Sequence, residues 1–301
     1  MNVCLSSIVA SRGKRTAAAA ALSAALLCSS SALAPRSDLA WAGPQDAVDE
    51  EIIRVIPNFS SIKYGWLAID DELKPMMEGP RPVRADPRHP YFGNQNGTQP
   101  TFRVSDLNSP ILTEWSKQIM KPANETTIAG KFPYSFQAYC MPGGVPGQLL
   151  GIFEPLFFVQ TKDMVYLMWQ RDHVVRRVYM NQKHTENPKP SWYGESVGHY
   201  EGDTLVIDTI GLSTKAPIDN WRTPHSEQLH VVERFKLVDG GDVLQAIVTI
   251  EDPIALTSPL TVYQRWNRFE GWLEEVACSE NNTSHMIAVK EPVPVADRPD
   301  F

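Results

Sequence analysis

The sequence lacks the short motifs that mark nucleotide, haem and dithiol chemistry. No GxGxxG or Walker A pattern occurs in its 301 residues, which argues against a nucleotide-binding loop. No C-x-x-C or C-x-x-C-H pattern occurs either, which argues against a redox dithiol and against covalent haem attachment. No internal repeat of about 20–50 residues is visible, so a propeller is not expected. We therefore expect a protein that works without a cofactor.

Positive charge is also scarce. Lys and Arg number 28 against 35 Asp and Glu, and the formal net charge is −7. An acidic chain without a basic run is a poor partner for nucleic acid or for an anionic membrane surface. These two classes of partner are therefore not expected.

Long apolar runs are missing outside the first 42 residues. A basic segment at residues 12–15, an apolar run at 16–27 and an Ala-Trp-Ala site at 40–42 before Gly43 predict a secretory signal peptide over residues 1–42. An uncleaved N-terminal membrane anchor is the alternative. No later stretch reaches the roughly 18 apolar residues of a membrane span, so the mature chain is expected to be periplasmic or secreted without one. Cleavage would remove four positive charges and one negative charge and bring the net charge to −10.

Only four cysteines are present, and Cys4 and Cys28 belong to the predicted leader. The remaining two, Cys140 and Cys278, are expected to form one disulfide in an oxidising compartment. Two buried free thiols are the alternative.

Proline and turn residues dominate residues 57–101, which excludes a regular helix or a central strand there. We expect an extended arm on the domain surface, followed by a helix that begins at Asn108-Ser109-Pro110 and ends near Lys121. A second short helix is expected over 123–129. The arm and these helices make up residues 43–135.

Residues 136–301 are predicted to form one antiparallel β domain. Short β-rich runs follow one another there with tight turns and no helical period between them, which favours a lipocalin-like barrel, with a β-sandwich as the alternative. The expected strands are 157–160, 164–170, 174–180, 194–200, 204–210, 229–238, 243–251, 261–269 and 272–278.

Seven motifs stand out within residues 130–285. They are CMPGGVP at 140–146, RRVY at 176–179, GESVG at 194–198, YEGDTLVIDT at 200–209, PHSE at 224–227 followed by LHVVERF at 229–235, VTIEDP at 248–253, and CSEN at 278–281. With these motifs the chain resembles a large family of uncharacterised exported bacterial proteins. The resemblance implies export and a β-rich domain, and it implies no reaction. The chain departs from the family at His199-Tyr200, where Arg-Trp is usual, and at residues 181–183, where Asp-Gly-Arg is usual; these departures point to a different ligand.

The most interesting single residue is Glu233. In a regular strand it shares a face with the apolar residues Val231, Phe235 and Leu237, so it is expected to point inward. Burial raises a carboxyl pKa unless a partner offsets it, which suits general acid/base work. The alternative is a structural ion pair with an arginine inside the barrel.

Residues near Glu233 complete a candidate catalytic set: His225, His230, Arg234 and His199. His225, His230 and Glu233 also suggest zinc or iron, but His230 and Glu233 point to opposite faces of a strand, which weakens the metal hypothesis. Ser196 fits a G-x-S-x-G pattern. The segment after it is a hairpin, whereas a nucleophile elbow needs a helix there.

Three functions remain open. The first is an exported, cofactor-independent isomerase, lyase or hydrolase that acts on a small, largely apolar molecule in a barrel pocket. The second is a periplasmic protein that binds such a small apolar or aromatic molecule without chemistry, with aromatic residues lining the site. The third is a secreted metal-dependent enzyme.

Overall fold

The computed structural model describes residues 57–61, 64–91, 103–131, 133, 141–151, 154–172, 174–271 and 273–275. In this part of the chain no helix is long and apolar enough to span a membrane. The predicted leader, the pairing of Cys140 with Cys278, and residues 276–278 of the last expected strand lie outside the described residues.

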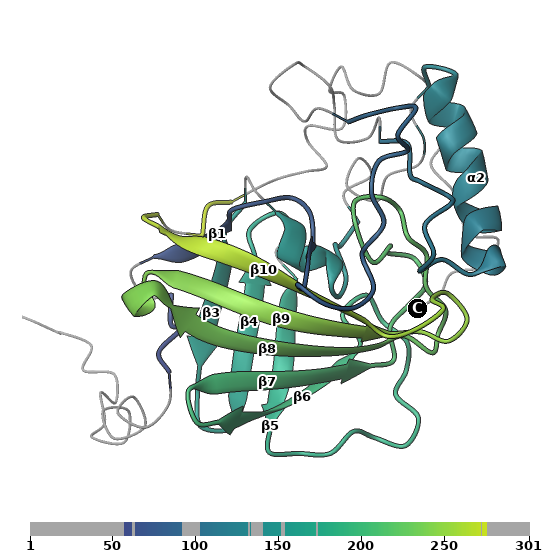
Figure 1. Ribbon diagram of the computed structural model, residues 1–301. Coiled ribbons are helices and arrows are strands. Elements are labelled where there is room, and N and C mark those ends of the chain that lie inside the picture. The colour runs from purple at the N-terminus through teal and green to yellow at the C-terminus, as the bar shows by residue number, and fades with distance from the viewer. Residues whose placement is uncertain are drawn as a thin grey trace, which may run out of the picture. The chain divides into compact units, whose positions relative to one another are not determined.

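Nine strands close into a barrel (Figure 1), in the order β1-β3-β4-β5-β6-β7-β8-β9-β10, and β10 pairs again with β1. The prediction of a mainly-β, lipocalin-like barrel is therefore confirmed over the sandwich. A two-residue strand, β2, lies beside β10. The strands are β1 (Gly65–Ala68), β2 (Lys74–Pro75), β3 (Leu156–Gln160), β4 (Met164–Trp169), β5 (Val175–Met180), β6 (Glu195–Glu201), β7 (Thr204–Ile210), β8 (His230–Val238), β9 (Val243–Glu251) and β10 (Leu260–Phe269).

The barrel departs from the expected antiparallel meander at one junction. Among the strand pairs of the described residues, β5 and β6 alone run parallel, with Val178 opposite Ser196. A parallel pair cannot be joined by a hairpin, because the chain must return to the end where the first strand began. Residues 181–194, which include Pro188 and Pro190, make this return and are called the crossover below.

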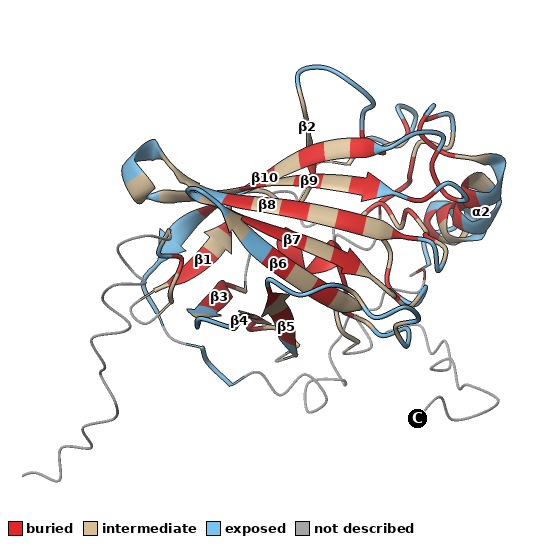
Figure 2. Cartoon of the chain, turned by 90° about the horizontal axis from the view of Figure 1, so that it is seen from below, coloured by how far each residue is buried: buried red, intermediate tan, exposed pale blue. Residues whose placement is uncertain are grey.

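The barrel interior is a packed core. Buried and half-buried residues alternate along the strands (Figure 2), as expected when one face of each strand points inward. Phe158, Phe235 and Trp266 are almost fully buried, with ring centroids 5.5 Å apart for the first pair and 6.0 Å for the second. The segment η4 (Gly147–Leu150) is also fully buried, and Leu149 accepts a hydrogen bond from Gln264 of β10.

Part of the expected surface arm belongs to the barrel. Trp66 of β1 is fully buried and pairs with Leu156 of β3 on one side and Arg268 of β10 on the other. Four residues are too few for strand alternation to be recognised within a proline-rich segment. The segment forms a strand because its backbone groups pair with β3 on one side and β10 on the other, which closes the barrel.

The helical segment also differs from the prediction. One helix, α2 (Glu114–Ile128), begins at the N-cap Thr113 and continues through Pro122. It is held by polar anchors on its buried face: Ser116 Oγ donates to the carbonyl of Ala255 at 2.7 Å, and the Asn124 side chain exchanges two hydrogen bonds with the backbone of Ser105. These tertiary contacts outweigh the hydrogen bond that Pro122 removes. The expected strand at 272–278 is likewise not formed at residues 273–275.

Two glycines test how tightly the crossover is joined to β6. Gly194 and Gly202 have nearly the same positive φ, 61° and 60°, but a Cβ on Gly194 would lie 2.3 Å from the carbonyl oxygen of Ile210, whereas a Cβ on Gly202 would meet nothing within 4 Å. We predict that Gly202→Ala lowers the free energy of unfolding by about 1 kcal/mol, the cost of the left-handed conformation. Gly194→Ala should lower it by about 3 kcal/mol or more, because backbone must also move. Urea unfolding of both variants measures the difference, and equal losses would contradict it.

Candidate functional site

Glu233 lies inside the barrel, as the strand alternation predicts. Its side chain is fully buried, and its neighbours on the same face, Val231 and Phe235, are fully buried as well. His230 and Arg234 point to the outer face. The candidate catalytic residues of β8 are therefore divided between the two sides of the barrel wall.

The partner of Glu233 is Arg176 of β5. Nη1 of Arg176 donates to Oε1 of Glu233 at 3.0 Å, and Nη2 donates to Oε2. Arg176 also donates from Nε to Oγ of Ser196 at 3.0 Å and from Nη2 to Oγ1 of Thr209 at 2.7 Å, and these two hydroxyls lie 2.9 Å apart. The four residues, here called the interior network, come from the adjacent strands β5, β6, β7 and β8.

The two charges of the interior network, on Arg176 and Glu233, are paired with each other. Arg176 is 1% exposed and Glu233 is 0% exposed, so both ions are removed from water. A buried ion pair is tolerated only when its geometry is good and its remaining hydrogen-bonding groups have partners. Both carboxylate oxygens of Glu233 are engaged with the guanidinium, and the ordered aromatic core lies beside them. This arrangement favours a structural role that links four strands.

Ser196 belongs to the same network and not to a nucleophile elbow. It is 1% exposed, lies inside β6 and bonds to Arg176 and Thr209. A serine nucleophile needs a neighbouring base, and the partners of Ser196 are a cation and a hydroxyl. The G-x-S-x-G match thus marks a strand residue whose glycine neighbours shape the start of β6.

The surroundings of His225 also favour a structural role. It is 3% exposed, its Nδ1 lies 2.8 Å from the carbonyl oxygen of Ser226, and burial lowers the pKa of its imidazole below the ordinary value. The next residue, Ser226, donates from its backbone N and its Oγ to Asp252, at 2.6 and 3.0 Å. These bonds hold the connection between β7 and β8 against the turn after β9.

His199 and Arg234 lie together on the outside of the barrel beside the β6–β7 hairpin. His199 Nε2 lies 3.0 Å from Oε1 of Glu201, and Nη2 of Arg234 donates to Oε2 of the same carboxylate. The group is about half exposed, and these ion pairs link β6 to β8 in solvent. Neither residue approaches Glu233, which lies on the other side of the wall.

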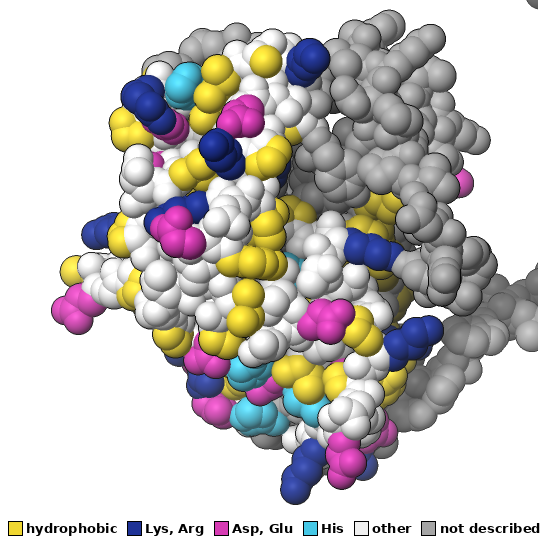
Figure 3. All heavy atoms as spheres, turned by 90° about the vertical axis from the view of Figure 1, so that its right-hand side faces the viewer, with side chains coloured by type: hydrophobic (Ala, Val, Ile, Leu, Met, Phe, Trp, Pro, Cys, Tyr) yellow, Lys and Arg dark blue, Asp and Glu magenta, His cyan; other side chains and the backbone are white. Residues whose placement is uncertain are grey.

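A second outer group contains His230. His230 Nε2 lies 3.0 Å from Oδ1 of Asp208, and its Nδ1 lies 3.2 Å from Oε2 of Glu251. His184 of the crossover repeats this arrangement: its Nε2 lies 3.0 Å from the same Oδ1 of Asp208, and its Nδ1 lies 3.1 Å from Oε1 of Glu195. We call these five residues the histidine–carboxylate row. Figure 3 shows histidine and acidic side chains gathered on one part of this face.

The described residues contain no group of three or more His, Cys, Asp or Glu side chains arranged to hold a metal ion. In the histidine–carboxylate row, both imidazoles are directed at one oxygen of Asp208. The suggested set of His225, His230 and Glu233 is also not assembled, because His225 is buried in the connection between β7 and β8, His230 lies on the outer face and Glu233 lies inside the barrel.

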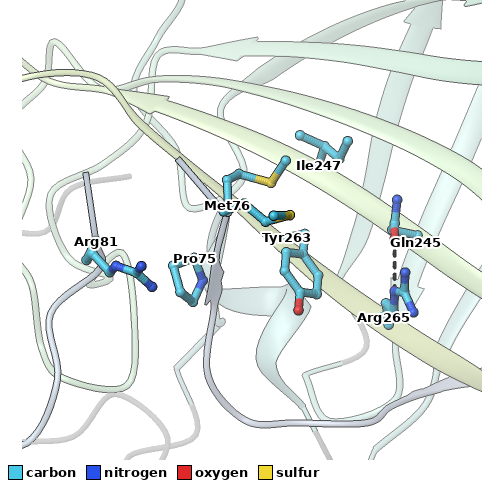
Figure 4. A pocket seen from close by; sticks show the side chains of 8 residues that line it. Pro75, Met76, Arg81, Gln245, Ile247, Tyr263 and Arg265 are labelled. Carbon is cyan, nitrogen blue, oxygen red and sulfur yellow. Dashed lines mark hydrogen bonds between the residues drawn. The ribbon is translucent and has the colours of Figure 1, made fainter. Parts of the chain in front are cut away.

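An open groove of about 590 Å³ lies on the outer face of β9 and β10, beside β2 (Figure 4). Gln245, Ile247, Tyr263 and Arg265 reach it from positions that alternate with buried core residues of these strands. In Figure 4, Arg81 and the Gln245–Arg265 pair lie on opposite sides of the apolar side chains. The groove is lined by Pro75, Met76, Met77, Arg81, Gln245, Ile247, Tyr263 and Arg265.

The groove carries positive charge on an acidic protein. Arg81 is exposed and has no ion pair with another described residue, and Arg265 donates from Nε to the side-chain oxygen of Gln245 at 2.9 Å. None of the described residues that line the groove is acidic. Two cations without a facing carboxylate create a local positive potential that attracts an anionic group.

Several of these residues were given no role by sequence reasoning. The strand pattern could have predicted that Arg176 points inward, because it shares one face of β5 with the apolar Val178 and Met180. Glu233 is related in the same way to its apolar neighbours in β8. Asp208 and Glu251 had no such signal, because polar residues are ordinary on the outer face of a strand. The sequence also contained no signal for the groove, because it depends on the pairing of β2 with β10, two strands separated by almost 190 residues in the chain.

Comparisons with known proteins assign no family to the chain. No protein-family model matches it, and no curated protein matches it.

The interior network can be tested by removing one charge or both. We predict that Glu233→Gln lowers the free energy of unfolding by about 3–5 kcal/mol, because Arg176 stays buried without a countercharge. The double variant Arg176→Met/Glu233→Leu should be within about 1–2 kcal/mol of the parent, since apolar residues of similar volume replace the pair and the hydroxyls of Ser196 and Thr209 still bond to each other. Denaturant unfolding of the parent, Arg176→Met, Glu233→Leu and the double variant gives the coupling energy, and Glu233→Gln is measured beside them. Additive losses would contradict a coupled pair.

Proposed function

We propose that this protein is a binding protein for a small aromatic carboxylate, which it holds in the outer groove of β9 and β10 without changing it chemically. The observation that carries the proposal is the composition of the groove: apolar and aromatic side chains between two arginines, on a chain whose formal net charge is −7. The predicted leader and the resemblance to exported proteins both support a protein that acts outside the cytoplasm.

The apolar part of the ligand is matched by the floor of the groove. Met76, Ile247 and Tyr263 offer a thioether, a branched aliphatic chain and an aromatic ring side by side (Figure 4). A flat aromatic body suits such a surface, because rings stack on Tyr and contact the polarisable sulfur of Met favourably.

The anionic part of the ligand is matched by the arginines. Guanidinium groups bind carboxylates through two parallel hydrogen bonds, a geometry that Lys cannot reproduce. Arg265 is already oriented, because Nε is bonded to Gln245 and its Cζ lies 5.8 Å from the ring centroid of Tyr263.

The same composition favours binding over catalysis. The eight lining residues include no His, Asp, Glu, Cys, Ser or Thr, which supply most general bases and nucleophiles in enzymes. Glu233, the leading candidate for acid/base work, is engaged with Arg176 on the other side of the barrel wall. The enzyme hypothesis would require the carboxylate to leave this pair, so the geometry supports the second of the three functions best.

The ligand class can be tested with 2-naphthoate and its methyl ester. An open groove should bind a ligand of about 13 non-hydrogen atoms with a Kd of roughly 0.1–1 mM. We predict that the ester binds at least about fivefold more weakly, because it lacks the charge that the arginines recognise. Isothermal titration calorimetry measures both affinities, and chromatography of the recovered ligand tests for turnover. Equal affinities, or conversion of the naphthoate, would contradict the proposal.

Charge-matched variants locate the site. Arg265→Gln and Arg81→Gln should each weaken 2-naphthoate binding about three- to tenfold. Arg177→Gln makes the same change in charge on the exposed outer face of β5 and should leave the affinity unchanged. If all three variants weakened binding equally, the effect would be one of net charge, and the groove would not be the site.

A further inference from the structure

The crossover is attached to the barrel in two different ways. Its ends are fixed by backbone hydrogen bonds: the N–H of Asn181 donates to the carbonyl of Gly198 at 2.7 Å, and Ser191 exchanges bonds of 3.1 and 2.8 Å with Gly211 and Ser213. Between these ends it is held by side chains, because His184 and Thr185 contact the outer faces of β6 and β7. The middle of the crossover therefore depends on ionisable groups.

The histidine–carboxylate row has an unusual hydrogen-bonding requirement. Each of the two imidazoles lies between two carboxylates, His184 between Glu195 and Asp208, and His230 between Asp208 and Glu251. An ionised carboxylate can only accept hydrogen bonds. All four contacts can be made together only when both rings carry a proton on each nitrogen, that is, as imidazolium ions.

The net charge of the row depends on whether the two imidazoles are protonated. With two imidazolium ions and three carboxylates the row has a net charge of −1, and with two neutral rings it has a net charge of −3. In the neutral state each ring turns one unprotonated nitrogen toward a carboxylate oxygen about 3 Å away, which is repulsive. Thr185 also donates to Glu195, from its backbone N at 2.7 Å and from Oγ1 at 3.0 Å, and these two bonds do not depend on the histidines.

We propose that the histidine–carboxylate row is a proton-dependent clasp that holds the middle of the crossover, residues 183–187, tightly against the barrel in mildly acidic surroundings and loosens it as the surroundings become alkaline, while the two bonds from Thr185 to Glu195 remain. The row is half exposed, so protons exchange freely with solvent. The titratable groups that these contacts bring together are Glu195 on β6, Asp208 on β7, His230 on β8, Glu251 on β9 and His184 on the crossover.

The range of pH follows from the direction of each shift. The hydrogen bond to Asp208 raises the pKa of His230 above its ordinary 6.5, so its stabilising contribution is complete below about 6.5 and is lost as the pH rises through the raised value. The hydrogen bond from His230 lowers the pKa of Asp208. Burial acts to raise the pKa of Glu195, but hydrogen bonds from Thr185 and His184 outweigh it and lower the value. The carboxylates contribute above about 4.5 and lose this contribution in stronger acid. The clasp is closed between these limits.

Hydrogen exchange of the backbone amides of residues 183–187 tests the clasp. We predict that, after correction for the intrinsic effect of pH, these amides exchange about fivefold more slowly at pH 5.5 than at pH 8.0, the factor expected from surface ion pairs of this kind. In His184→Gln the difference should disappear, because the crossover then places no imidazole beside Asp208. Protection that is equal at the two pH values in the parent protein would overturn the proposal.

His199→Gln is the matched control, because His199 lies on the same outer face and contacts a carboxylate but is not a member of the row. It should keep the full pH difference, and loss of the difference in this variant would overturn the proposal. Each measurement is repeated with EDTA and with zinc chloride. Protection at pH 8.0 that appears with zinc and disappears with EDTA would show that the row takes up a metal ion in place of protons, and would also overturn it.

Discussion

The pair formed by Arg176 and Glu233 is the constraint on which the barrel depends. Two ions are placed in a core of aliphatic and aromatic side chains, where each alone would be strongly destabilising. They are tolerated because the guanidinium bonds to both carboxylate oxygens and to the hydroxyls of Ser196 and Thr209. Four strands must therefore hold these residues in register, and one of the three junctions involved is the parallel pairing of β5 with β6. A one-residue shift of any strand would turn its member of the network outward and leave a buried charge or hydroxyl without a partner.

Because the ion pair and its network occupy the inside of the barrel, we look for a functional site on the outer face. The interior network is satisfied within itself, and the aromatic core fills the space beside it, so the inner face serves stability. The outer face has features that stability does not require: a groove with two arginines on an acidic protein, and a row of five titratable groups that includes His184 of the crossover. The two features lie on different parts of the outer face, the groove on β9 and β10 and the row from β6 to β9, so that each can be altered without changing the other.

The row and the parallel junction are connected through the crossover. A parallel pair requires a long return segment, and such a segment needs contacts along its length to stay against the barrel. Backbone bonds at Asn181 and Ser191 hold its ends, whereas His184 holds its middle through side-chain contacts with Glu195 and Asp208. The departure from a simple meander thus creates the segment on which the proposed clasp acts.

The sequence by itself predicted a barrel, the bounds of β3 to β10 to within a few residues, and the inward direction of Glu233, because strand alternation is a local property with a period of two. The same alternation could have identified Arg176, an ion among apolar neighbours in β5. Sequence could not reveal β1, because a four-residue strand carries too little pattern, nor that α2 continues through Pro122, because anchors from distant segments hold it there. The sequence also did not predict that His184 lies beside Asp208 or that Met76 and Tyr263 line one groove. These contacts depend on the path of the crossover and on the pairing of β2 with β10. They join residues far apart in the chain, and a local periodic pattern carries no information about such contacts.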